Sequence, residues 1–98
     1  MLESEFQSKL IKDLEFRFEG CVVFKTDPSY IQGFPDLMIL YNNRWAALEC
    51  KKNVNSIIRP NQDYYINLLK KMSFSSFIYP ENKKEVIYEL QKSFSPRR

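Results

Sequence analysis

The sequence contains no histidine, which excludes histidine-ligated zinc sites, Ser-His-Asp triads and general acid–base catalysis by imidazole. It has only two glycines, too few for a glycine-rich phosphate-binding loop. No apolar run approaches the ~20 residues that span a bilayer, and the acidic, amphipathic start fits no secretory signal. Cys21 and Cys50 lie in apolar, strand-like runs and are expected as buried thiols, not as a disulfide. We therefore expect an intracellular, cytoplasmic protein, and any chemistry that it performs must use carboxylates and lysines, with or without a metal ion.

The residues that are present indicate one small packed domain with an uneven charge. A chain of 98 residues, 44% hydrophobic and 15% aromatic, is long enough for a single core. Residues 1–50 carry 5 basic and 8 acidic side chains, whereas residues 51–98 carry 10 basic and 4 acidic ones, a net +6. Most basic pairs are expected on solvated helix faces, but this second half also suits a polyanionic partner.

The periodic segments predict an α/β fold with a mixed four-stranded sheet, in the order α-β-β-β-α-β-α. Helices are expected over residues 2–19 and after Pro60 and Pro80, and short strands over residues 21–25, 36–41, 45–51 and 74–79. The first three strands form a meander, and a helical crossover brings the fourth in parallel to a neighbour. One domain covers residues 1–98, with a frayed basic tail over about 94–98. The expected inward side chains of the last two helices are Tyr64, Tyr65, Leu68, Leu69, Met72, Val86, Ile87 and Leu90.

A predicted hairpin brings two acidic residues together. The Asn-Asn pair at 42–43 tolerates the positive φ angles of a two-residue turn, which pairs Tyr41 with Arg44. Continuing this antiparallel pairing backward places Asp36 opposite Glu49, with Cβ atoms roughly 5 Å apart.

Lys51 lies two residues beyond Glu49 and is therefore expected on the same face of the sheet. Opposed carboxylates are destabilising unless a cation lies between them, and Mg²⁺ favours one or two carboxylates together with substrate phosphate. The simpler interpretation is that Asp36 caps the strand in solvent while Glu49 pairs with Lys51.

These residues resemble a known nuclease signature. Pro35-Asp36 followed by Glu49-Cys50-Lys51 resembles the PD-(D/E)xK motif. Gln32-Gly33 before it, Arg59-Pro60-Asn61-Gln62 after it, and Glu3-Ser4-Glu5-Phe6-Gln7 in the first helix are similar to the VRR-NUC branch of that superfamily. Related sequences commonly have Ser where this one has Arg59, which leaves the capping of the second helix open and makes Arg59 a candidate phosphate contact beside the site.

The resemblance implies a restriction-endonuclease-like core and a Mg²⁺- or Mn²⁺-dependent phosphodiesterase. Stand-alone members of the branch, often phage-encoded, resemble Holliday-junction resolvases, so branched DNA is the implied substrate. By the same resemblance, Asp36, Glu49 and the main-chain carbonyl of Cys50 would hold the metal. Lys51 would orient the attacking water or stabilise developing charge, and Gln62 would hydrogen-bond the water, the phosphate or Lys51.

The helical wheel selects Glu3 as the first-helix acid that joins the site. With ~100° per residue, Glu3 falls in the middle of the apolar face set by Leu2, Phe6, Leu10, Leu14 and Phe18, whereas Glu5 falls on the opposite side. Gln7 lies one turn from Glu3 and would share its network. The alternative is that Glu3 simply occupies the first helical turn, where the helix dipole favours acids.

Three functions remain open at the level of sequence. The first is a structure-specific DNA endonuclease, expected as a homodimer because two symmetric cuts need two sites. Its interface would use exposed aromatics such as Tyr64, Tyr65, Phe74 or Phe77, unless these pack in the core. The second is a non-enzymatic nucleic-acid-binding module of the same fold, and the third is a small interaction protein with a chance motif.

Overall fold

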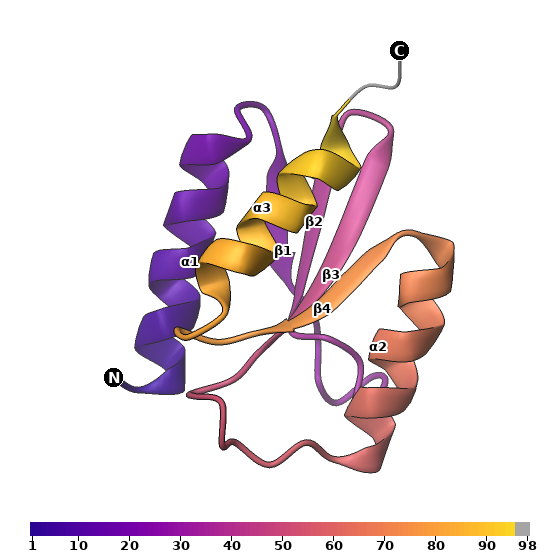
Figure 1. Cartoon of the computed structure of the whole chain (residues 1–98). Coiled ribbons are helices and arrows are strands. Elements are labelled where there is room, and N and C mark those ends of the chain that lie inside the picture. Colours follow the sequence, from indigo (N-terminus) through magenta and orange to yellow (C-terminus); the bar gives the residue numbers. More distant parts are fainter. Residues whose placement is uncertain (96–98) are drawn as a thin grey trace.

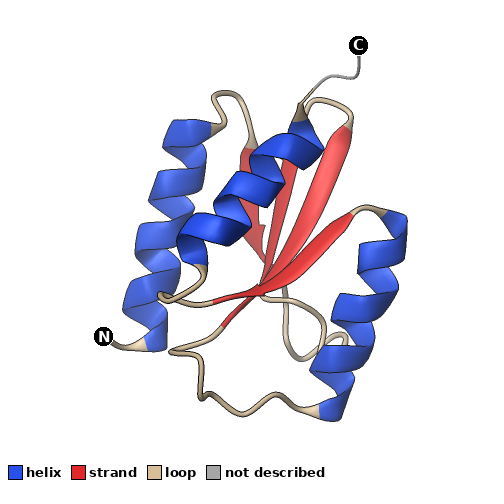
Figure 2. Cartoon of the chain, in the orientation of Figure 1, coloured by secondary structure: helices blue, strands red, loops and turns tan. Residues whose placement is uncertain are grey.

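The computed structural model describes residues 1–95 and has the predicted order of helices and strands (Figures 1 and 2). These elements are α1 (Glu3–Arg17), β1 (Val22–Lys25), β2 (Leu37–Tyr41), β3 (Arg44–Cys50), α2 (Pro60–Met72), β4 (Phe74–Ile78) and α3 (Lys83–Phe94). The sheet order is β1-β2-β3-β4, in which the first three strands are antiparallel and β4 runs parallel to β3. The predicted α/β class, meander and helical crossover are confirmed.

The β2–β3 hairpin has the predicted register. Tyr41 pairs with Arg44 across the turn, and the ladder continues to Leu37 opposite Leu48. Asn42 adopts a φ of 56°, which asparagine tolerates better than most residues because its side chain bonds locally. The turn therefore fixes which side chains of the hairpin face each side of the sheet.

Helices cover the two faces of the sheet unequally. Side chains of α1 and α3 pack with Leu37, Ile39 and Leu48 in one buried cluster. The figure shows α1 and α3 side by side, with α2 set apart on the other side of β4 (Figure 1). Ile66 and Leu69 of α2 are buried but lie outside that cluster, so α2 covers the opposite face. No helix within residues 1–95 is long and apolar enough to cross a membrane.

Several details of the predicted helices are wrong. Leu2 is 60% exposed and is not part of the apolar stripe of α1, because the helix begins only at Glu3. In α2, Tyr64 and Met72 are exposed, and Ile66 is buried in place of them.

The end of the chain also differs from its prediction. Helix α3 begins at Lys83 and not at Pro80, because Asn82 precedes its first turn and its side chain accepts a hydrogen bond from Tyr79 N–H (2.8 Å). Phe94 is buried and helical, so no frayed tail begins there. Residues 96–98 lie outside the described part of the chain. Both cysteines are free thiols, as expected, although only Cys50 is fully buried.

Candidate active site at the open end of the hairpin

Asp36 lies immediately before β2 and is held from two directions. Its Oδ2 accepts a hydrogen bond from Cys50 N–H of β3 (2.9 Å). Its main-chain carbonyl accepts one from Thr26 N–H (2.8 Å), while the Thr26 hydroxyl donates to the Pro35 carbonyl (2.6 Å). Pro35 itself is buried. These contacts fix Asp36 beside the end of β3, so it does not cap the strand in open solvent.

Glu49 lies beside Asp36 and is only 4% exposed. Its pKa is raised to about 8, first by burial and then by the Asp36 carboxylate. Burial also raises the pKa of Asp36. The expected like-charge pair is therefore present, and ionising both carboxyls at neutral pH requires a compensating cation.

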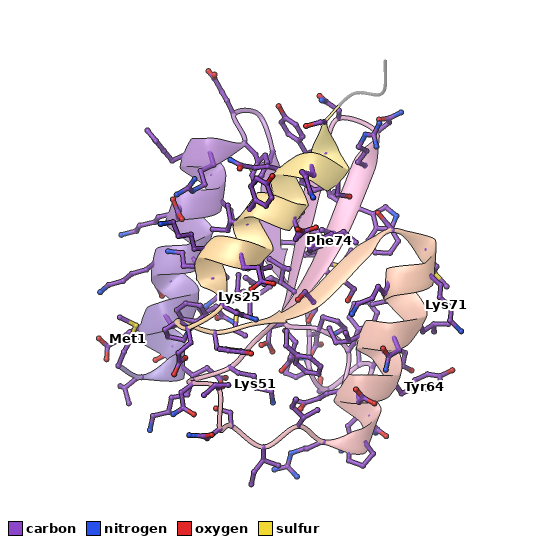
Figure 3. The ribbon with its side chains drawn as sticks, viewed as in Figure 1. Met1, Lys25, Lys51, Tyr64, Lys71 and Phe74 are labelled. Atoms are coloured by element: carbon purple, nitrogen blue, oxygen red, sulfur yellow. The ribbon has the colours of Figure 1, made fainter. Side chains whose placement is uncertain are left out.

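Lys51 lies two residues after Glu49, so its side chain is on the same face of the sheet as the two carboxyls. It is 8% exposed, and its Nζ lies 3.8 Å from Glu49 Oε2. The ammonium donates to Gln62 Oε1 (2.7 Å) and to the Ile57 carbonyl (3.0 Å). Figure 3 shows Lys51 low in the molecule, between the first turns of α1 and α2. Lys51 is thus a fixed charge, unlike a mobile surface lysine.

Gln62 connects the second helix to both charged groups. Its Nε2 donates to Glu49 Oε2 (3.1 Å), while its Oε1 accepts hydrogen bonds from Lys51 Nζ and from Arg59 N–H (3.0 Å). The last bond caps the start of α2 from position N3, because an arginine at the N-cap has no acceptor of its own. The N-terminus of α2 is therefore capped by Gln62, a residue of the candidate site, which makes the N3-to-N-cap hydrogen bond of a capping box.

The first helix contributes two side chains, Glu3 and Gln7, that act on the pKa values of the site. Glu3 is exposed, so its predicted place in the buried face is wrong; that position lies in the first turn, where the helix end meets solvent. Its charge nevertheless raises the pKa of Glu49 and that of Cys50. The Gln7 side chain lowers the pKa of the Cys50 thiol, against the larger effect of burial, which raises it. Glu5 accepts a hydrogen bond from Leu2 N–H (3.3 Å), which gives it a capping role.

The donor set fits a hard divalent cation. Within residues 1–95, no three side chains of His, Cys, Asp or Glu converge, so the protein side chains would supply two carboxylates. In an extended strand, the N–H and C=O of one residue point to the same side. The Cys50 carbonyl therefore lies on the Asp36 side, where its N–H bonds Oδ2. Two acidic oxygens and one carbonyl, completed by phosphate and water, match the ligands that Mg²⁺ prefers.

Sequence reasoning missed two supports of the site. The Ile57 carbonyl holds Lys51, and no side-chain pattern signals a main-chain acceptor in a loop. Gly33, at φ +87°, lies so close to the start of α2 that a Cβ there would overlap the Cβ atom of Asn61. The only available signal was the glycine itself, which permits a positive φ and close backbone approach.

Comparisons with protein-family models, with curated proteins and with solved structures gave no match. The case for a function therefore depends on the chemistry of the assembled side chains. Those side chains are Asp36, Glu49, Lys51 and Gln62, with Glu3 at the margin.

Proposed function

We propose that this chain is a metal-dependent DNA endonuclease that hydrolyses phosphodiester bonds, with branched DNA such as a Holliday junction as its substrate. The observation that carries the proposal is that the buried Glu49 carboxyl lies 3.8 Å from the buried Lys51 ammonium and beside the half-buried carboxyl of Asp36. Lys51 is the single buried lysine or arginine among residues 1–95. Burying an ammonium costs free energy even when it is paired, so a buried lysine beside two carboxyls is a candidate for a functional group. A site that gathers them at the end of a sheet, in a chain whose second half has net charge +6, suits phosphate chemistry.

The candidate roles follow from the geometry. Asp36, Glu49 and the Cys50 carbonyl would hold Mg²⁺ or Mn²⁺, which when bound lowers the pKa of water and polarises a phosphoryl oxygen. Hydrolysis joins a water oxygen to phosphorus and releases the sugar oxygen, which takes up a proton.

Lys51 uses two of its three N–H groups on Gln62 and Ile57, which leaves one for a phosphate oxygen or the attacking water. Gln62 holds Lys51 and Glu49 in a fixed relation, so the charges need little reorganisation when the substrate arrives.

Nicking of a labelled four-way junction, beside linear duplex and single strand, tests the proposal with Mg²⁺, Mn²⁺ or chelator. We expect cutting only with metal, and no cutting by Asp36→Asn or Glu49→Gln although both variants remain folded. Glu81→Gln, which changes an exposed carboxylate outside the site, is the matched control and should cut normally. Unchanged nicking by either site variant would refute the site assignment.

The alternative of a non-enzymatic binding module is decided by the same experiment. Junction binding by the parent protein without nicking, across both metals, would support that alternative and reject the nuclease.

A further inference from the structure

An aromatic hollow lies next to the candidate site on the same face of the sheet. Phe24 of β1 pairs with Met38 of β2, and both line the hollow together with Tyr30 and Phe34 of the preceding loop. Its volume is about 410 Å³. Met38 lies two residues after Asp36, so the pleat points both side chains to one face, roughly 7 Å apart along the chain.

The hollow is joined to the site. Thr26, which also lines it, donates its N–H to the Asp36 carbonyl (2.8 Å). Phe34 packs edge-on against Tyr65 of α2, with 5.6 Å between ring centroids. A main-chain hydrogen bond therefore joins the wall of the hollow to the candidate metal ligand.

The fold leaves two of the three aromatic side chains of this hollow exposed to solvent, whereas Phe34 is half-buried. Tyr30 is 84% exposed and Phe24 is 45% exposed. Exposed apolar surface beside a polar site marks a place where a ligand is expected.

We propose that this hollow takes one unpaired nucleobase of the DNA strand whose phosphate lies at Asp36 and Glu49. The inference rests on the proposed function, and it names which part of the substrate the chain recognises. A nucleotide joins its phosphate to its base through a single sugar, so both groups reach neighbouring sites. Every base has a flat π face that stacks on tyrosine or phenylalanine, and a base that is already unpaired leaves the helix at little cost.

The polar group of the hollow favours a base over a phosphate or an aliphatic side chain. Asp27 lines it, and its carboxylate accepts hydrogen bonds from Ser29 N–H (2.9 Å) and from the Ser29 hydroxyl (2.7 Å). These bonds lower the pKa of Asp27, so it stays ionised. A carboxylate repels phosphate, is costly to cover with aliphatic surface, and accepts hydrogen bonds from the amino group of cytosine.

The test measures the affinity of the protein for a fluorescent single-stranded oligonucleotide. A chelator is present, so that no metal-dependent cutting of the DNA occurs. Tyr30→Ala is expected to weaken binding about tenfold or more. Phe16→Ala is the matched control, because Phe16 is 87% exposed on α1 and takes no part in the hollow. Oligonucleotides that each lack one base should then be compared. At one position the parent protein and Tyr30→Ala should bind with equal affinity, because the base that stacks on Tyr30 has been removed.

The outcomes separate this inference from the proposed function. The base site is overturned if Tyr30→Ala binds the oligonucleotide as tightly as the parent protein does. It is also overturned if Tyr30→Ala binds more weakly than the parent whichever base is removed. Both conclusions hold even if the parent protein cuts DNA. A Tyr30→Ala change in the sedimentation of DNA-free protein also overturns it, because a second copy of the chain then covers the hollow. Base-dependent binding by a protein that never cuts rejects the nuclease and keeps the base site.

Discussion

At the scale of single residues, the surroundings of Glu49 disfavour ionisation of its carboxyl group in the absence of a metal ion. The pKa of Glu49 is raised to about 8 by burial and by Asp36, whereas in the unfolded chain it returns to its ordinary range. The folded protein therefore retains a proton that the unfolded chain loses. This contribution to stability is fully present below the unfolded pKa and disappears as the pH rises through the folded pKa.

We accordingly predict a pH dependence of folding that belongs to Glu49. In chelator, the free energy of unfolding of the parent protein should fall relative to that of Glu49→Gln between about pH 5 and about pH 8. Urea denaturation at several pH values measures the difference. Added Mg²⁺ should raise the parent's stability at pH 8 and leave Glu49→Gln nearly unaffected. Parallel pH profiles for the two proteins would contradict the raised pKa.

A second residue-scale prediction separates two acids of one helical turn. Glu3 acts electrostatically on Glu49, whereas Glu5 caps the helix. Glu3→Gln is expected to reduce turnover roughly tenfold or more with little change in junction affinity, because the Glu3 carboxylate would hydrogen-bond water of the metal site and would not contact the DNA. Glu5→Gln should retain near-normal turnover. Single-turnover nicking measures both, and a larger loss in Glu5→Gln would reverse the assignment.

At the scale of secondary-structure elements, the loop before β2 and the start of α2 form one unit. Gly33 contacts Asn61 directly, next to Gln62. Gly33→Ala adds a left-handed strain of ~1–2 kcal/mol and an overpacking cost of ~1–3 kcal/mol, and it should also displace Gln62 and slow nicking. Gly20→Ala is the matched control, because Gly20 has φ +88° but nothing within 4 Å of the added Cβ, so only the strain remains. Equal loss of stability and activity in both variants would contradict the contact.

The far end of α2 offers a separate prediction about DNA binding. Lys70 and Lys71 lie about 12 Å along the helix from Gln62, and Figure 3 shows Lys71 far from Lys51. Changing both lysines to Glu should weaken junction binding. It should also make the slope of the logarithm of the binding constant against the logarithm of the salt concentration less steep, by about one for each phosphate that these lysines neutralise in the parent protein. Lys92→Glu is the control, since Lys92 pairs with Glu89 on α3 (3.5 Å). An unchanged slope would mean that Lys70 and Lys71 face only solvent.

At the scale of the whole molecule, the sequence predicted what short-range rules determine. The Asn-Asn turn fixed the hairpin register, and that register alone brought Asp36, Glu49 and Lys51 to one face. The burial of Tyr64, Met72 and Leu2 was predicted wrongly, because a helical stripe does not reveal how far the neighbouring sheet extends. The Ile57 carbonyl and the Gly33–Asn61 contact were also missed, since both depend on how two distant loops meet.

Assembly is the remaining whole-molecule prediction. One site per chain cannot make two symmetric cuts, so we expect a two-fold dimer with about twice the 11.8 kDa of the chain. Sedimentation at micromolar concentration measures this mass. A strict monomer that still cuts both strands of a junction would refute the two-site argument.

Gln62 has one further consequence, for the motions of the native state. The same Oε1 atom caps α2 at Arg59 N–H and holds Lys51, so local unfolding of the first helical turn and loss of the site are one event. Arg59 is exposed, and its amide would otherwise exchange quickly with solvent. The hydrogen-exchange rate of this single amide should therefore report the fraction of molecules with an assembled site, and Gln62→Ala should abolish its protection.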